Sequence, residues 1–495
     1  MLTFILLNGG AVLAALAVAA RLGLHGRASA LLLGTLSGYL VLVHSSVLLA
    51  GLLGYLTPGG LAAIVTAVVL AAAWLARGPR PAPPIPDGAA RFTPASLLAP
   101  LAAIAAGAAW AWPHLFEATR LWVWDDYTYH MVYPALWLRE HAIAAPTPAQ
   151  AFTMQAWYPL SASVVATWFM VPFSGARGEA LAWVSLTGLL YAGLVAAGAG
   201  ALCWRLGCRR GAWAVPVVLF ATSHRTAVMA GSFSDADLCQ AASLFGALVF
   251  AIPRADAETA RDVRVDSGYA GLLTGIALGV KVSAAAPALV VLLAMVLRAR
   301  ALGAHPGEGM RAVVKVGLVF AVSWAATGGY WYARNGGHTG NPVYPAAFLA
   351  WPGATFPETT LLEYGHRHGV RRTLADALAV YLNWPRLHAG LAIAGLVGLA
   401  AWLIARRPLL TRAQRYFACT TLAVAASVLV LLPAAPFSAG NAMTFRSGFV
   451  HWDSMRYVAI LLLLGWAALG VLVDAGAGAG HRRTLAAVQI GRAHV

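Results

Sequence analysis

Hydrophobic runs close to 20 residues long recur along this chain, and they constrain its fold more than any other feature. About 20 apolar residues in a helix cross the hydrocarbon layer of a membrane. The chain is 60% hydrophobic and 11% charged, whereas a soluble domain carries roughly 25% charged residues. We therefore predict an all-α, polytopic bundle of about 11–13 transmembrane helices, with short amphipathic helices in its exterior loops. The clearest runs are at about residues 2–20, 29–53, 60–76, 97–115, 180–203, 212–230, 237–253, 313–333, 388–405, 415–435 and 457–473.

The formal net charge of +16 comes from arginines that stand in small groups between the runs. Such groups mark cytoplasmic loops by the positive-inside rule. The charge therefore indicates topology and contact with anionic membrane lipids rather than a nucleic-acid partner. It places the N-terminus and the loop after residue 115 outside. The groups include Arg21 and Arg27; Arg77, Arg80 and Arg91; Arg205, Arg209 and Arg210; Arg298, Arg300 and Arg311; Arg406, Arg407, Arg412 and Arg415; Arg482 and Arg483.

Two segments do not fit a simple series of spans. Residues 158–174 are apolar enough to cross, but a crossing there would place every later arginine group outside. The rule therefore favours a helix that fails to span, or a compensating short segment. Residues 269–297 begin and end beside loops of the cytoplasmic type, so they must enter and return. Two half-length helices that meet near Lys281 would satisfy this requirement.

The organisation that follows has four parts. Residues 1–78 form three N-terminal spans, 79–96 a Pro-rich cytoplasmic linker, 97–473 the main membrane domain and 474–495 a cytoplasmic tail. Residues 490–495 read as the translation of a sequencing adapter, and in that case the natural protein continues beyond residue 489. The four cysteines show no metal-ligand spacing and no disulfide framework.

The segment Trp122–His130 places adjacent carboxylates, Asp125 and Asp126, among aromatic residues just after a hydrophobic run. The chain has only 18 acidic residues in 495, and ionisable groups at a membrane boundary are usually functional. One carboxylate could act as a general base, the pair could hold a divalent cation, or one could cap a short helix that extends to Glu140. His130 follows Asp126 by four residues and so shares its helical face. The sequence indicates no cofactor other than this possible divalent cation.

Four further groups of polar residues come from distant parts of the chain to the predicted exterior side. Asp235 and Asp237 stand at a helix start, as caps or as further site carboxylates. Small residues spaced by four lead to Lys281, which either binds a lipid phosphate or snorkels to the interface. The third group is Arg334-Asn335, which ends the predicted span at 313–333 and precedes a Gly- and Pro-rich turn with Tyr344. The fourth is Arg456-Tyr457, which begins the last span as a phosphate ligand or an interfacial anchor.

In this order the motifs resemble those of the GT-C membrane glycosyltransferases, in particular the RgtA/B/C/D-like and protein-mannosyltransferase-like (ArnT-type) branch. The resemblance spans roughly residues 97–473. It rests on Asp125–His130, Tyr158–Leu160, Gly275–Lys281, Arg334–Pro345 and Arg456-Tyr457, with a looser match at Asp235 or Asp237. That family usually has one span before the acidic loop, and this chain has four, which keeps the loop on the same side.

The resemblance implies a GT-C-like fold and an inverting transfer of a hexosyl or pentosyl group. The donor would be a polyprenyl-phosphate-linked sugar, and the acceptor a lipid, a glycan or a protein at the exterior face of a bacterial inner membrane. Asp125 would be the base with Asp126 assisting, and the cations Lys281, Arg334 and Arg456 would bind the donor phosphate. Two alternatives remain: a transporter or flippase for a lipid-linked sugar, which would need no reacting carboxylate, and a non-catalytic scaffold.

Overall fold

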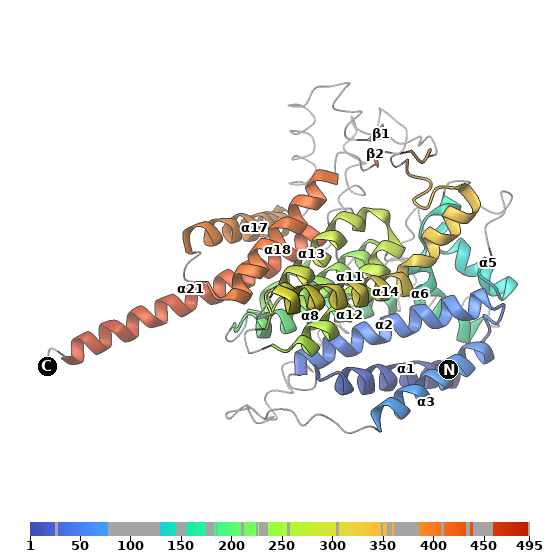
Figure 1. Cartoon of the computed structure of the whole chain (residues 1–495), viewed down its shortest axis with the longest axis horizontal. Coiled ribbons are helices and arrows are strands. Elements are labelled where there is room, and N and C mark those ends of the chain that lie inside the picture. The colour runs from blue at the N-terminus through green and yellow to red at the C-terminus, as the bar shows by residue number, and fades with distance from the viewer. Residues whose placement is uncertain are drawn as a thin grey trace.

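The chain folds into a bundle of helices with one long helix that projects from it (Figure 1). The structure is a computed structural model of the whole chain. It describes residues 1–24, 28–77, 129–144, 155–174, 183–184, 186–208, 212–223, 226, 236–254, 258–302, 306–347, 350–353, 359–360, 386–406, 410–431, 436–438 and 459–493.

Within these residues the helices overlap the predicted runs, and the predicted run at 97–115 lies outside them. The order is α1 (Leu2–Arg21), α2 (Ala28–Leu52), α3 (Pro58–Ala76), α5 (Val132–Glu140), η3 (Gln155–Trp157), α6 (Ser161–Met170), η4 (Val171–Phe173), α8 (Leu186–Arg205), α9 (Ala214–Thr222), α11 (Ala236–Ala251), α12 (Ala260–Val280), η5 (Val282–Ala284), α13 (Ala285–Arg300), α14 (Pro306–Thr339), β1 (Thr359–Thr360), α17 (Arg386–Arg406), α18 (Arg412–Leu431), β2 (Pro436–Ser438) and α21 (Ala459–Ala493).

Eight helices in the described part of the chain are long and apolar enough to cross a membrane, and three shorter helices are also apolar. Over the same residues the strands are limited to β1 and β2, which form one short antiparallel pair. The prediction of an all-α, polytopic membrane bundle is confirmed. The last helix differs from expectation, because α21 continues from the predicted span into the predicted cytoplasmic tail, as far as Ala493.

The segment around Lys281 enters and returns, as the charge pattern predicted. The chain leaves α12 at Lys281, whose backbone is extended, and begins α13 after one short turn. Arg298 at the end of α13 bonds to Glu258 and Asp266 at the start of α12, so the two helices run in opposite directions. The predicted half-length of each helix was wrong. The 21 residues of α12 extend for about 30 Å, enough to span the hydrocarbon layer.

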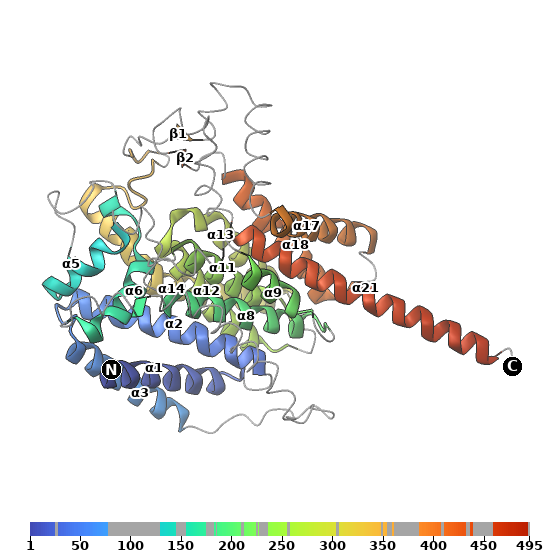
Figure 2. The same cartoon turned by 180° about the vertical axis from the view of Figure 1, so that it is seen from behind.

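The hairpin of α12 and α13 defines the two ends of the bundle, the Arg205 end and the Lys281 end. The Arg205 end is where α8, α11 and α13 finish and α12 begins. The Lys281 end is where α11 begins at Asp237 and the hairpin turns. The N-terminus lies at the Lys281 end near α5 and α6, and the C-terminus lies far off at the opposite end (Figures 1 and 2).

Helix α6 settles the ambiguous segment at residues 158–174. With η4 it covers 13 residues, from Ser161 to Phe173, or about 20 Å, which is too short to span. Its first residue bonds to His44 in the second half of α2. Its end packs near the N-terminus of α1, where the rings of Phe4 and Phe173 lie 5.5 Å apart. The helix that fails to span, which the charge rule favoured, is what forms.

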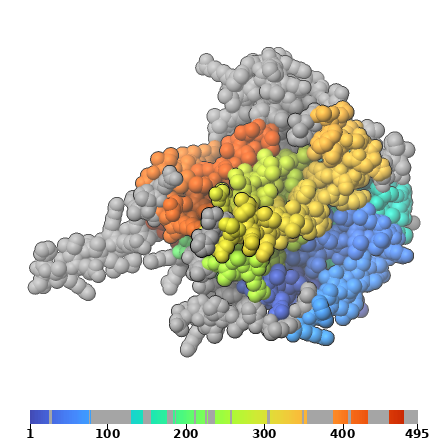
Figure 3. All heavy atoms as spheres, viewed as in Figure 1, coloured from blue at the N-terminus to red at the C-terminus, as the bar shows by residue number. Residues whose placement is uncertain are grey.

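Helices α12 and α14 approach closely through glycine. A Cβ on Gly275 would lie 2.5 Å from the carbonyl oxygen of Trp324, and one on Gly328 would lie 2.4 Å from the carbonyl oxygen of Gly275. Only a hydrogen fits at either position, so the backbones touch, as small residues spaced by four allow. Helix α14 then crosses one face of the molecule between the N-terminal helices and the C-terminal helices (Figure 3).

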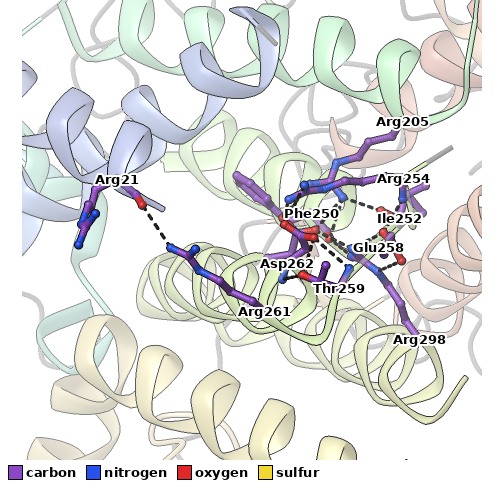
Figure 4. A network of polar contacts seen from close by, with 11 residues as sticks. Arg21, Arg205, Phe250, Ile252, Arg254, Glu258, Thr259, Arg261, Asp262 and Arg298 are labelled. Carbon is purple, nitrogen blue, oxygen red and sulfur yellow. Dashed lines mark hydrogen bonds and ion pairs between the residues drawn. The ribbon is translucent and has the colours of Figure 1, made fainter. Parts of the chain in front are cut away.

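A buried ionic network joins the helices at the Arg205 end, and the sequence did not predict it. Both nitrogens of the Arg205 fork bond to the Asp266 carboxylate, at 2.9 and 2.8 Å. Arg298 donates to the same carboxylate at 2.7 Å and to Glu258 at 2.6 Å. Figure 4 shows these side chains converging with Arg254.

The network also uses the backbone. Arg205 donates to the carbonyl of Ile252 and Arg298 to that of Phe250, both at 2.7 Å. Arg205 and Arg298 were counted among the cytoplasmic loop charges, but they are 1% and 0% exposed and end helices inside the protein. The carboxylates of Asp266 and Glu258 together compensate the two charges, which lets the two guanidinium groups lie away from water.

Candidate functional site

The Lys281 end gathers several of the residues predicted to form a site. Lys281 stands at the turn of the hairpin, and its ammonium pairs with the carboxylate of Asp237 in the first turn of α11. Gln240, one turn further along α11, donates to the Ser283 hydroxyl at 3.0 Å. The lysine and the predicted acidic residue therefore meet, and the charge of Lys281 is balanced at close range.

Arg334 lies in the last two turns of α14 and is 8% exposed. Its guanidinium stands between two indole rings, 4.9 Å from the ring centre of Trp331 and 5.4 Å from that of Trp157. Such cation–π contacts are strongest where water is excluded. Its hydrogen bonds go to neutral oxygens, the side chain of Asn335 at 2.9 and 3.0 Å and the carbonyl of Tyr158 at 3.3 Å. Among the residues that the structure describes, no carboxylate pairs with it.

Asn335 orders the chain around this arginine. Its amide nitrogen donates to the carbonyl of Trp157 at 2.9 Å and to that of Tyr344 at 2.8 Å, while its oxygen accepts from Arg334. The side chain thus ties the end of α14 to η3 and to the turn that follows. Tyr344 lies in that turn, with its ring 6.2 Å from that of Trp157. These bonds occupy the Asn335 side chain, so it acts as a support for Arg334.

Ser161, the first residue of α6, connects the arginine side of the site to the lysine side. Its hydroxyl oxygen accepts from the indole nitrogen of Trp331 at 2.9 Å and lies 2.9 Å from Nε2 of His44. A Cβ on Gly279 would come within 2.2 Å of the same oxygen. Gly279 precedes Lys281 by two residues, so α2, α6, α12 and α14 all meet at this hydroxyl.

His130 belongs to the same region. It is buried, and its Nδ1 lies 3.2 Å from the hydroxyl oxygen of Ser163, two residues after Ser161. The neighbouring ring of Tyr129 makes an edge contact with Tyr158 at 5.5 Å. His130 therefore lies against α6, the helix whose first residue accepts the hydrogen bond of Trp331, and its role in the site stays a prediction.

Helix α5 contributes aromatic side chains that pack against Trp331. Trp137 stacks on Trp331 with ring centres 6.5 Å apart and lies 6.0 Å from the ring of Tyr133. The Tyr133 hydroxyl is buried and has no hydrogen-bond partner among the residues that the structure describes. Burial raises the pKa of Tyr133 to about 12, although the charge of Arg334 opposes the rise. The phenol therefore stays protonated near neutral pH and could donate to an anion beside Arg334.

The other predicted site residues cannot be placed. Asp125, Asp126, Asp235, Arg456 and Tyr457 lie outside the described residues.

Within the described part, no group of three or more His, Cys, Asp or Glu side chains could hold a metal ion. The described residues do bring together two cations. Lys281 is paired with a carboxylate, and Arg334 contacts two indole rings and has no carboxylate partner among those residues. Such a set suits an anion with an apolar neighbour.

Sequence reasoning missed Ser161, Trp331 and His44. A serine at a helix start and a tryptophan in an apolar run are common, and neither has a spacing that indicates a site. His44 did carry a signal, since a histidine in the middle of a membrane span is rare and usually functional.

No family model and no curated protein matches the chain. Among solved structures, the chain is similar to the crystal structure of ArnT from Cupriavidus metallidurans in the apo state, with 16% sequence identity. The alignment covers 76% of this chain and 77% of that one, and the TM-score is 0.39. A similarity at this level of superposition does not assign a fold, so the site rests on the contacts described above.

Proposed function

We propose that this protein is a membrane glycosyltransferase of the GT-C type. It moves a hexosyl or pentosyl group from a polyprenyl-phosphate-linked donor to a lipid, glycan or protein acceptor, with inversion at the anomeric carbon. The reaction takes place at the Lys281 end, which faces the exterior of a bacterial inner membrane. That orientation follows from the positive-inside rule, because the arginine groups gather at the opposite end.

The observation that carries this proposal is the state of Arg334. A buried charge is costly unless an opposite charge compensates it, and the described partners of Arg334 are neutral oxygens and indole rings. A phosphate supplies the missing charge, and the planar fork of arginine matches its oxygens with two parallel hydrogen bonds. The buried Tyr133 hydroxyl near this group is a further donor, and none of the described residues accepts its hydrogen bond.

The location favours a lipid-linked phosphate over a free one. Helix α14 has 34 residues and extends about 50 Å, which exceeds the hydrocarbon thickness of about 30 Å. Arg334, in its last two turns, is thus where a phosphate at the head of a membrane lipid would lie. Lys281 supports the same anion from across Ser161, with its charge shared with Asp237.

In the proposed mechanism, Asp125 removes the proton from the acceptor hydroxyl or amine as that atom attacks the sugar, and Asp126 assists. The bond from the sugar to the phosphate oxygen breaks, and the polyprenyl phosphate leaves with its charge held by Arg334 and Lys281. Arg456 and Tyr457 complete the donor site, and His130 orients the acidic segment. A divalent cation at the acidic pair remains an alternative to direct base catalysis.

The test supplies polyprenyl-phosphate sugars to membranes that contain wild-type or variant protein. We expect Asp125→Asn to lose transfer and to retain donor binding, and Arg334→Gln to bind the donor about 10–100-fold more weakly, because a charged hydrogen bond contributes about 1.5–3 kcal/mol. Arg139→Gln is the matched control, since Arg139 is 67% exposed and already paired with Glu140.

Three outcomes would count against parts of this proposal. Equal transfer by wild type and Asp125→Asn would exclude Asp125 as the base. Unchanged donor affinity in Arg334→Gln would exclude the phosphate site. Movement of a lipid-linked sugar between leaflets, with no transfer from any donor, would identify a flippase instead.

A further inference from the structure

His44 lies in α2, one of the three N-terminal helices that the sequence placed outside the main domain. Its side chain is fully buried, and its Nε2 lies 2.9 Å from the Ser161 hydroxyl oxygen. Nδ1 has no partner among the described residues. A half-satisfied imidazole within a membrane helix is costly. Its one hydrogen bond is the feature that links this helix to α6.

The hydrogen bond between His44 and Ser161 also affects α14, because Ser161 has a second partner there, Trp331. A hydroxyl oxygen accepts through two lone pairs and donates one proton. The oxygen of Ser161 accepts from Trp331, whose indole can only donate, and it pairs with His44 in either imidazole tautomer. Without His44, the hydroxyl keeps a single partner and is free to rotate. His44 therefore fixes the direction in which Ser161 receives the Trp331 indole.

Trp331 in turn supports Arg334. Its ring lies 4.9 Å from the guanidinium carbon and is fully buried. Gly279 packs against another side of the indole, since a Cβ on this residue would come 3.3 Å from the Trp331 ring and 2.2 Å from Ser161 Oγ. The indole has little room to find another position that still supports the arginine, so a loss of its hydrogen bond shifts Arg334.

Helix α1 holds the same short helix at its other end. The Asn8 side-chain oxygen accepts from Trp168 at 3.0 Å and from Tyr39, and Phe4 contacts Phe169 with ring centres 6.2 Å apart. Helix α6 does not span the membrane and is too short to be stable alone. The N-terminal helices thus fix both ends of the helix that carries Ser161 and Ser163.

We propose that His44 is a positioning residue of the site and that the N-terminal unit formed by α1 and α2 is a working part of it. The unit sets the position of Arg334 through His44, Ser161 and Trp331. The functional part of this inference rests on the proposed function, since it takes Arg334 as the ligand of the donor phosphate. The structural part, from His44 to the end of α14, is independent of any substrate.

The first experiment measures the affinity of the full-length protein, in detergent micelles, for a short-chain polyprenyl phosphate. A glutamine nitrogen can occupy the position of histidine Nε2, whereas an asparagine reaches only that of Nδ1. We expect His44→Gln to bind as wild type does and His44→Asn to bind about tenfold more weakly, as expected for the loss of one buried hydrogen bond. Ser37→Ala is the matched control, because Ser37 is fully buried in the same helix and its hydroxyl has no hydrogen-bond partner in the described part of the chain.

The second experiment measures amide hydrogen exchange over residues 329–339 in the same variants, and it needs no ligand. Exchange should be faster in His44→Asn than in His44→Gln or Ser37→Ala. Equal exchange and equal affinity in all three would overturn the proposal. If wild type binds no polyprenyl phosphate but the exchange differs as expected, the proposed function fails and the positioning role of His44 stands.

Discussion

Replacing Asp266 by asparagine tests the strongest energetic statement that this structure makes. The side chain of Asp266 is fully buried and accepts three hydrogen bonds, two from Arg205 and one from Arg298. Asparagine has nearly the same shape but carries no charge, and its NH₂ group would face guanidinium donors. The substitution therefore removes hydrogen bonds and leaves an uncompensated positive charge inside the protein.

Removal of one partner from a buried ion pair costs about 3–5 kcal/mol. The matched variant is Asp262→Asn, one turn earlier on α12. Asp262 pairs with Arg254 at 3.0 Å and caps the helix with Thr259, but its side chain is 25% exposed. Exposed pairs and caps contribute about 1 kcal/mol. With the pair and the cap of Asp262 counted together, we therefore expect the two variants to differ by at least about 1 kcal/mol, or roughly fivefold in the equilibrium constant of unfolding.

Unfolding can be followed in mixed micelles by the reaction of buried thiols with a fluorescent reagent. Cys203 and Cys239 are buried, and Cys419 is exposed and would be replaced by serine to lower the background. The free energies of unfolding of the two variants are then compared in this background. If Asp266→Asn is no less stable than Asp262→Asn, the network does not hold the Arg205 end together.

Two further predictions concern the helices that form the site. Gly275→Ala should destabilise the protein, because its Cβ would lie 2.5 Å from the carbonyl oxygen of Trp324, whereas Gly317→Ala has no neighbour within 4 Å. Equal stability of the two variants would contradict the close contact of α12 and α14. Lys281→Met and Asp237→Asn should each cost more stability than the double variant, with a coupling of about 1–3 kcal/mol. A double-mutant cycle with a coupling energy of zero would mean that the ion pair contributes nothing to stability.

Several features of the fold could be predicted from the sequence, because their causes are local. The length of an apolar run determines whether a helix can span, and loop arginines determine which end stays inside. On these grounds α1, α2 and α3 were predicted within two residues at each end. Length and charge together predicted the return at Lys281, and for residues 158–174 the charge rule favoured a helix that fails to span or a compensating short segment. The halved lengths of α12 and α13 were wrong because the estimate counted only apolar residues, whereas α12 begins with several charged residues, of which Asp266 is buried against Arg205 and Arg298.

The sequence by itself determined that this chain forms a helical membrane bundle, and it indicated which residues deserve attention at one end. Only the tertiary structure decided their partners. Lys281 is balanced by Asp237, 44 residues away, and Arg334 is supported by Trp157 from a distant helix. Hydrophobicity and charge act on each segment separately, so they are visible in a sequence. A buried hydrogen bond such as that from His44 to Ser161 depends on which helices pack together, and that is settled only when the chain has folded.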